Sequence, residues 1–344
     1  METAGHEGAS GCPAPGRVVC FGEALALVSE VARVDDPAAP ASAAGAEVNV
    51  ALDLASAGVP VTWIGRVGDD PHGALITRAL AMAGVHTGGI EIDPARPTGR
   101  YAKSATPGAP GAHDGPLTRM HYRRAGSAAS AAGPGLPDRP GVRELLATAS
   151  WVHLGGITAA VSPSCAAALD ALLERPRTYR VTFDVNWREQ MWPDGDPSLV
   201  AALAARADVV LVGADEAGRV FGTADPAGLR ALLPDPDLLV LKDGADRTLA
   251  VHPDGTVTSR PALAVDVVEP VGAGDAFAAG LLSGLVRGDD VGRCLRRGHL
   301  GAAAVLVVPG DSAPPLPAHL LDLDDDAWAG LRVRPDGVVE GMPA

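Results

Sequence analysis

Short apolar runs alternate with segments of helical periodicity along most of this chain. Arg17 to Phe21 is apolar after its first residue and stops at Gly22, which predicts a buried strand. Glu47 to Ala57 repeats apolar residues at helical spacing and stops at Gly58, which predicts a helix. The same reasoning predicts a strand at Val61 to Val67, a helix at Pro71 to Ala83, and later strands at Trp151 to Leu154, Arg180 to Asp184, Val209 to Val212 and Leu238 to Leu241.

This alternation predicts an α/β fold with a doubly wound, mostly parallel sheet and helices on both of its faces. In such a sheet, ligands bind at the carboxyl ends of the strands. Residues 28–44 and 89–125 break the rhythm, because their short β-like pieces do not alternate with helices. They predict a separate small β-sheet, with Pro107 to Pro116 as a loop, or else an irregular insertion.

Three segments follow from this pattern. Residues 1–16 are expected to be a disordered leader, and residues 17–310 the main domain, including the small sheet. Residues 311–344 are rich in Pro and Asp and form a C-terminal extension to which the sequence assigns no chemistry.

Composition narrows the class of protein. The 344 residues are 47% hydrophobic, enough for a large core, and carry a formal net charge of −14. That charge argues against binding to nucleic acid or to an anionic membrane, both of which need a basic face. The sequence has no apolar run of about 18 residues and no signal-peptide pattern at its start, so a cytoplasmic protein is expected. Cys12, Cys20, Cys165 and Cys294 are widely spaced and are expected to be reduced packing residues.

The most informative motif is a glycine-rich turn before an apolar helix, at residues 267–280. Gly272 and Gly274 lack side chains, so backbone N–H groups of the turn can converge on an anion at the helix start. Asp275 follows at once, where a carboxylate can take a proton from a hydroxyl that attacks a phosphoryl group. The motif indicates a kinase; the alternative is a glycine-rich turn with an ordinary acid near a helix start.

This segment resembles the C-terminal signature Asp-Thr-x-Gly-Ala-Gly-Asp of the ribokinase-like (PfkB) carbohydrate kinases. Gly272, Ala273, Gly274 and Asp275 match it, whereas Glu269 and Pro270 replace Asp-Thr. The resemblance implies a ribokinase-like fold whose small sheet is a lid over the sugar, often with a dimer contact through the lid. It also implies ATP as phosphoryl donor, Asp275 as base, and amides around residues 272–274 that stabilise the phosphoryl charge.

A second segment resembles the family's N-terminal pattern Gly-Gly-x-x-x-Asn-x-Ala. It is Ala44 to Ala51, in which Ala44 replaces one glycine, and it implies that Gly45 and Asn49 contact sugar hydroxyls. Asn49 is alternatively a helix-start residue bonded to its own backbone. Gly65 to Gly73 also matches the family, and Asp70 is expected to cap the helix that begins at Pro71.

Two segments resemble the family's nucleotide site. Gly213 to Glu216 stands where the family has Asn-x-x-Glu, so Glu216 is expected to hold the water shell of Mg²⁺, or else to be a first-turn helix acid. Lys242-Asp243-Gly244 resembles the family's Lys-x-Gly turn, which implies that Lys242 and Gly244 lie near ATP. The alternative for Lys242 is a solvated strand-end lysine.

Two further segments resemble 2-keto-3-deoxygluconate kinases: Tyr122 to Ser130 and Asp184 to Trp192. Arg123 and Arg188 are then expected to bind the carboxylate of a sugar acid, because guanidinium matches carboxylate in a bidentate manner. Arg123 is alternatively a solvated strand residue, and Arg188 alternatively binds the phosphoryl group. Tyr101, with Tyr122, is expected to wall the sugar site.

These residues predict ATP- and Mg²⁺-dependent phosphorylation of a primary hydroxyl of a sugar acid, namely 2-dehydro-3-deoxy-D-gluconate at O6. A kinase for fructose, ribose or a nucleoside is the alternative, and a catalytically silent relative is a further one. A dinucleotide oxidoreductase is disfavoured because Gly-x-Gly-x-x-Gly is absent after Phe21. The expected partners are a small sugar substrate and a second copy of the chain, bound through the lid.

Overall fold

The computed structural model describes residues 16–106, 117–174, 176–192, 194–335 and 337–341. The expected leader, except for its last residue, and the loop Pro107 to Pro116 lie outside these residues. Nine strands form the central sheet in the order β13-β12-β11-β10-β9-β8-β1-β4-β5. Parallel strands are β1 (Arg17–Phe21), β4 (Val61–Gly68), β5 (His86–Asp93), β8 (Ala149–Gly155), β9 (Arg180–Asp184), β10 (Val209–Gly213) and β11 (Leu238–Asp243); antiparallel strands are β12 (Arg247–Val251) and β13 (Val257–Pro261).

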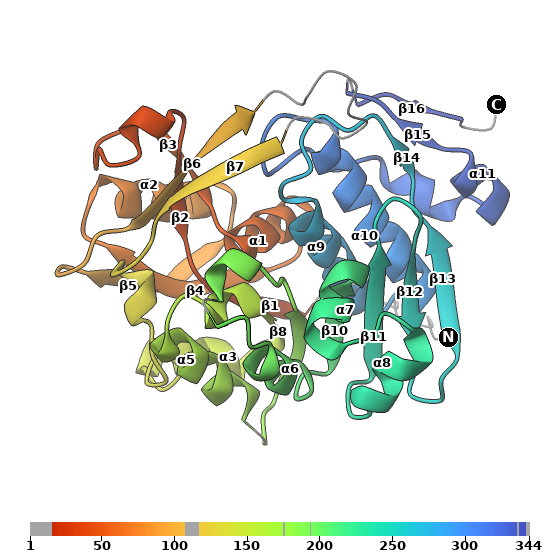
Figure 1. Cartoon of the computed structure of the whole chain (residues 1–344), viewed down its shortest axis with the longest axis horizontal. Helices are drawn as coiled ribbons and strands as arrows, with labels where there is room; N and C mark the ends of the chain where they lie inside the picture. The colour runs from red at the N-terminus through yellow and green to blue at the C-terminus, as the bar shows by residue number, and fades with distance from the viewer. Residues whose placement is uncertain (1–15, 107–116, 175, 193, 336, 342–344) are drawn as a thin grey trace, which may run out of the picture.

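Alternate residues of the strands face two separate cores. In β1, Val18 and Cys20 pack on one side, and Val19 and Phe21 pack on the other. The first side is covered by α1 (Ala46–Ser56), α2 (Pro71–Met82), α9 (Ala273–Arg287) and α10 (Val291–Leu306). The second is covered by α3 (Pro140–Ala147), α4 (Gly156–Ala159), α5 (Pro163–Leu173), α6 (Ser198–Ala204), α7 (Ala214–Phe221) and α8 (Pro226–Leu232). The predicted doubly wound α/β fold is therefore confirmed (Figure 1).

The small sheet is a lid above the carboxyl ends of the central strands (Figure 1). It contains β2 (Leu25–Val28), β3 (Ala41–Ala44), β6 (Gly99–Thr106) and β7 (Leu117–Arg123), in the order β3-β2-β6-β7. Its boundaries correct those expected from sequence. Residues 89–93 belong to β5 of the central sheet, parallel to β4, so the second part of the lid begins only at Gly99.

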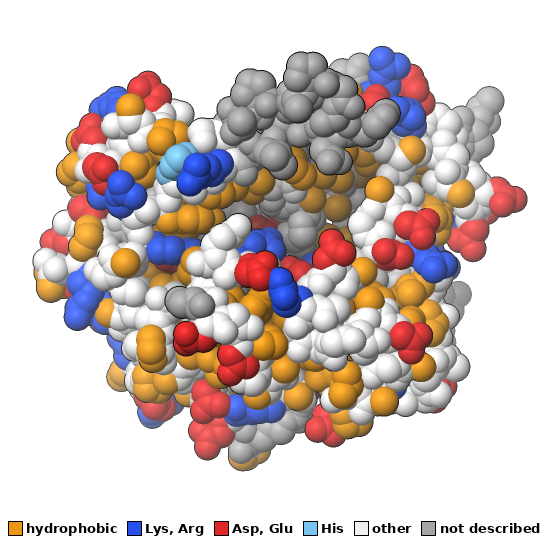
Figure 2. Space-filling model, in the orientation of Figure 1, with side chains coloured by type: hydrophobic (Ala, Val, Ile, Leu, Met, Phe, Trp, Pro, Cys, Tyr) orange, Lys and Arg blue, Asp and Glu red, His pale blue; other side chains and the backbone are white. Residues whose placement is uncertain are grey.

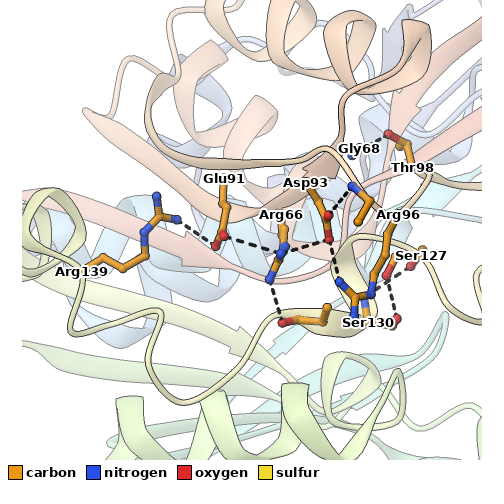
Figure 3. Close-up of polar contacts among 11 residues, drawn as sticks. Arg66, Gly68, Glu91, Asp93, Arg96, Thr98, Ser127, Ser130 and Arg139 are labelled. Carbon is orange, nitrogen blue, oxygen red and sulfur yellow. Dashed lines mark hydrogen bonds and ion pairs between the residues drawn. The ribbon is translucent and has the colours of Figure 1, made fainter.

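A polar network holds the chain where β5 turns toward the lid (Figure 3). Arg66 forms an ion pair with the buried Asp93 at 3.0 Å, and Arg96 contacts the same carboxylate at 3.3 Å. Asp70 caps α2 as predicted, accepting from Gly73 N at 2.8 Å. It also accepts from the backbone N and the hydroxyl of Thr98, at 2.7 and 2.8 Å. One carboxylate therefore fixes both the start of α2 and the root of the lid.

Replacing Asp70 with Ala is expected to lower the free energy of unfolding by about 2 kcal/mol, because a helix cap and two further hydrogen bonds are lost. Urea denaturation measures the change. Asp69→Ala is the matched control, since the neighbouring side chain is exposed, and it should change the free energy by less than about 0.5 kcal/mol. Equal stability of the two variants would contradict a structural role for Asp70.

The C-terminal segment packs against α10 instead of extending freely. Trp328 is fully buried in a third hydrophobic core. Its indole N–H donates to Pro261 O at 3.1 Å. This region contains η4 (Ala318–Asp322), α11 (Asp325–Ala329) and a three-stranded sheet of β14 (Ala264–Val265), β15 (Arg332–Val333) and β16 (Val339–Glu340). The remaining short helices are η1 (Val31–Arg33), η2 (Ala129–Ala131) and η3 (Glu189–Met191).

Cys20, Cys165 and Cys294, the cysteines of the described ranges, are buried and free. None of the helices within those ranges is both long enough and apolar enough to cross a bilayer.

Candidate active site

The space between the lid and the carboxyl ends of the central strands forms a cleft. Figure 2 shows the molecule hollowed there, with basic and acidic side chains gathered along its lower wall. A cavity of about 410 Å³ at this edge is lined by residues 187–190 and by Asp215, Glu216 and Arg219 of α7. The predicted site residues come from both the sheet edge and the lid.

Helix α9 begins at the cleft with the predicted glycine-rich turn. Gly272 is its N-cap and has φ 88°, a left-handed conformation that favours glycine. No side chain caps this helix start, so N–H groups of the first turn are available to an anion. A Cβ on Gly272 would come within 3.2 Å of the Asp311 backbone, so the turn also lies close to the chain after α10.

The side chains of Asn49 and Asp275, which are 226 residues apart in the sequence, are in contact. The Asn49 amide donates to Asp275 Oδ2 at 2.9 Å. Burial raises the pKa of Asp275 to about 7, against the Asn49 hydrogen bond that lowers it, and the nearby Asp184 carboxylate raises it further. A carboxylate with a pKa close to neutral suits proton abstraction from a hydroxyl.

The start of α1 fixes Asn49. Gly45 is the N-cap of α1 with φ 131°, and a Cβ there would lie 2.3 Å from Glu23 O. Only glycine therefore lets the loop after β1 approach this helix start. Asn49 N bonds to Gly45 O at 2.8 Å as part of the helix, which leaves its side chain for Asp275.

Lys242 and Asp184 form a partly buried ion pair beside the glycine-rich turn. Lys242 Nζ lies 3.1 Å from both Asp184 oxygens. Despite burial, which lowers it, the pKa of Lys242 is raised by Asp184, and Glu216 and Asp275 contribute. Its Nζ would be 3.8 Å from a Cβ on Gly274, so this cation faces the same helix start. Gly244, with φ 52°, forms the turn after β11.

Arg188 and Glu216 also meet. Arg188 Nη1 donates to Glu216 Oε1 at 3.1 Å, while Glu216 Oε2 accepts from Gly213 N at 2.9 Å. Glu216, in the first turn of α7, thus binds back to the backbone N–H of the N-cap Gly213, as the alternative interpretation of this residue as a first-turn helix acid holds. The guanidinium of Arg188 is half exposed. Burial is the largest influence on the pKa of Asp275 and raises it, and the charge of Arg188 is a smaller influence that lowers it. Arg188 therefore faces the cleft.

The lid contributes its inner face, on which Tyr101 and Tyr122 stack with ring centroids 5.4 Å apart. Because side chains alternate along a strand, Arg123, the last residue of β7, points to the opposite face from Tyr122, whereas the next residue, Arg124, turns toward the Tyr122 ring. Arg124 lies 4.7 Å from the Tyr122 ring centroid and pairs with the buried Glu23.

Arg123 points away from the cleft. Its exposed guanidinium pairs with the exposed Asp35, with Nε 2.5 Å from Oδ1. The geometry therefore corrects the expectation for the lid arginine: Arg124 faces the cleft, and Arg123 corresponds to the solvated strand residue of the alternative. The signal that could have identified Arg124 was its spacing of two residues from Tyr122.

Asp311 joins the lid to the main domain. It accepts from Tyr101 Oη at 2.9 Å and from Lys103 Nζ at 2.5 Å. The sequence assigned no chemistry after residue 310 and did not anticipate this contact. No local pattern marks Asp311, because its partners lie 208 and 210 residues away.

A further acidic residue, Glu47, is buried in the first turn of α1, two residues before Asn49. Burial raises its pKa to about 8, against the hydrogen bonds that lower it, one of them from the Thr158 hydroxyl at 3.0 Å. Its other oxygen has no hydrogen-bond partner among the described residues. Glu47 is therefore mostly protonated at neutral pH, which limits the negative charge beside Asp275 and Glu23.

Comparison with known proteins decides the family. The model of the pfkB family carbohydrate kinases matches residues 16–319. The chain is a PfkB-family carbohydrate kinase. This PfkB kinase is 32% identical over 286 residues to the 2-dehydro-3-deoxygluconokinase of Thermoproteus tenax, covering 81% of this chain and 84% of the relative. It is 31% identical to the 2-dehydro-3-deoxygalactonokinase of Haloferax volcanii, over 78% of this chain and 83% of the relative.

A solved PfkB protein from Polaromonas sp. JS666 has the same fold as this PfkB kinase. The TM-score is 0.72 at 30% sequence identity, covering 87% of this chain and 97% of that one. Fructokinases and 5-dehydro-2-deoxygluconokinases are also among the relatives. The family assignment and the sugar kinase activity are therefore firm, whereas the relatives divide over the acceptor.

Proposed function

We propose that this kinase transfers the γ-phosphoryl group of ATP to O6 of 2-dehydro-3-deoxy-D-gluconate. The observation that carries the proposal is the guanidinium of Arg124 on the inner face of the lid, beside Tyr122. A neutral hexose has no group that needs such a cation, whereas a sugar acid does. Arg124 has five N–H donors, and its contacts with Glu23 and Met191 use three of them, which leaves two for a carboxylate.

The acceptor would lie between the lid and Asn49. Its carboxylate would bind Arg124, the tyrosine rings would cover its apolar face, and Asn49 would bind a hydroxyl. The primary hydroxyl at the other end would then reach Asp275, which takes its proton as the phosphoryl group is transferred. Arg188 remains a second cation for either the carboxylate or the phosphoryl group.

The phosphates of ATP would occupy the start of α9. The N–H groups from Gly272 to Asp275 would stabilise charge on the phosphoryl oxygens, with Lys242 beside them. Gly244 would let the backbone after β11 approach the nucleotide. Lid closure would exclude water, which otherwise competes with the sugar hydroxyl.

The residues also fit Mg²⁺. In the ranges that the structure describes, no three His, Cys, Asp or Glu side chains form a metal-binding group. A kinase site needs none, because Mg²⁺ keeps waters and binds mainly to phosphates. Glu216, already bonded to Gly213 N and Arg188, would hold such a water through its carboxylate. When bound, the ion neutralises charge on the β- and γ-phosphates.

A substrate panel tests the acceptor. Initial rates are measured with 2-dehydro-3-deoxy-D-gluconate, its galactonate epimer, fructose and ribose at saturating ATP and Mg²⁺. We expect kcat/KM for the sugar acids to exceed that for fructose and ribose by at least about tenfold, the value of one charge-assisted hydrogen bond. ³¹P NMR of the product should place phosphate on C6. A higher kcat/KM for fructose would overturn the proposal in favour of a fructokinase.

A further inference from the structure

A separate cavity of about 490 Å³ lies on the side of α9 that faces away from the central sheet. Its floor is formed by Ala276, Ala279, Gly280 and Ser283, which recur at helical spacing on one face. The opposite face of α9, which includes Phe277 and Leu281, packs in the core under the sheet.

Helices α1 and α10 form the walls of this cavity, and parts of segment 313–321 lie across it. Most lining residues are Ala, Gly, Leu, Val or Pro. A concave space of this volume with apolar walls and a few polar groups is typical of a small-molecule site.

The positively charged groups lie at one end of the cavity. The guanidinium of Arg287 reaches back to Ser283 O, seven residues after Ala276 on α9, so about 10 Å of helix lies between it and the Ala276 end of the cavity floor. Arg287 donates to Ser283 O at 3.0 Å and to Ala57 O at 2.5 Å, which leaves further N–H groups of its guanidinium. Arg297 is next to it, paired with Asp289 at 2.5 Å. Because Arg287 and Arg297 have, among the described residues, only Asp289 as a close acid, the charge at this end of the cavity is positive.

Asp53 of α1 lies on one wall of the cavity. One of its oxygens, Oδ2, is buried and has no hydrogen-bond partner among the described residues. Burial and the charge of Asp275 raise the pKa of Asp53 to about 7, so it is substantially protonated at neutral pH. A mostly apolar cavity thus has Asp53 on one wall and a pair of cations at one end.

We propose that this cavity binds a small amphipathic carboxylate as an effector of the kinase. The carboxylate pairs with Arg287 and Arg297, and its hydrocarbon chain lies along Ala279 and Gly280 toward Asp53. The charge pattern favours an anion with an apolar body, whereas the body of a sugar acid is covered with hydroxyl groups.

The chain after α10 connects this cavity to the cleft. Ser312 donates to Asp53 Oδ1 at 3.4 Å, and Ala313 lines the cavity. The preceding residue, Asp311, contacts the lid through Tyr101 and Lys103 and lies against Gly272. An occupant that moves Ser312 therefore moves Asp311, and the KM for the acceptor should respond more than kcat.

The experiment uses octanoate as the probe and octan-1-ol as its uncharged match. Binding to the full chain is measured by calorimetry and by the shift of Tm, without ATP or sugar, so the result does not depend on which acceptor the kinase uses. Ser56→Trp fills the cavity from the exposed end of α1, with Ser56→Ala as its control. Arg287→Gln removes the cation.

We expect saturable octanoate binding that Ser56→Ala retains, that Ser56→Trp abolishes, and that Arg287→Gln weakens about tenfold. Octan-1-ol should bind at least about tenfold more weakly than octanoate. Unliganded Tm values within about 2 °C of the wild type verify that the variants fold. Absence of saturable binding, equal binding of the alcohol, or octanoate binding unchanged by Ser56→Trp would each overturn the proposal.

Discussion

Replacing Asp275 with Asn is expected to lower kcat by about 10²- to 10⁴-fold, the usual contribution of a general base. Asn has nearly the same shape but cannot accept the proton of the sugar hydroxyl. The contact with Asn49 can persist through the amide oxygen, so KM and Tm should change little. A coupled assay for ADP release measures the rate, and near-ultraviolet circular dichroism checks the fold. Turnover above about a tenth of the wild-type value would rule out this role.

The pH dependence of kcat/KM is a second test of the role of Asp275. The pKa of Asp275 is raised to about 7 in the free protein, and its ionised form is the active one. Wild-type kcat/KM should therefore rise through pH 7 and level off above it, because protonation removes the base as pH falls. The residual activity of Asp275→Asn should lack this rise. An identical pH dependence in both proteins would assign the titration to another group.

Replacing Arg124 with Met is expected to lower kcat/KM for a sugar acid by about 10- to 100-fold, since a charge-assisted contact with the carboxylate is lost. The effect on fructose should be much smaller. Rates with both sugars under matched conditions give the ratio that tests it. An equal loss for both sugars would show that Arg124 has no part in selecting the acid.

Arg123→Met is the matched control for this change, because the neighbouring guanidinium pairs with Asp35 on the exposed face. It should leave both rates within about twofold of the wild type. Arg124→Met also leaves Glu23 buried without its partner, which destabilises the protein. The double variant Glu23→Gln/Arg124→Met removes that unpaired carboxylate. It should recover Tm without recovering selectivity for the acid.

The sequence predicted most of the central sheet because the parallel strands β1, β4, β8, β9, β10 and β11 are largely buried and read as apolar runs. The run from Arg17 to Phe21 coincides with β1. Residues 89–93 of β5 were assigned to the lid because His86–Asp93 is an edge strand with polar residues and two glycines, so no apolar run marks it. Its pairing with β4 depends on contacts that the local pattern does not contain.

The candidate site was predictable where a motif carries its own geometry. The turn from Gly272 to Asp275 forms a helix start whatever surrounds it, and Asn49 lies one turn into α1. The lid residues were harder to predict, because Arg123 and Arg124 are the same residue type at adjacent positions. Only their directions in the folded lid distinguish them. Asp311 could not be found at all, since a loop acid acquires its role from Tyr101 and Lys103.

The double contact of Asp311 with Tyr101 and Lys103 ties the lid to the loop that lies against Gly272. Any movement of the lid away from this loop must break both bonds. The contact involves no reacting atom and is physically distinct from the proton acceptor, so weakening it would change how the lid is held without altering the group that takes the proton.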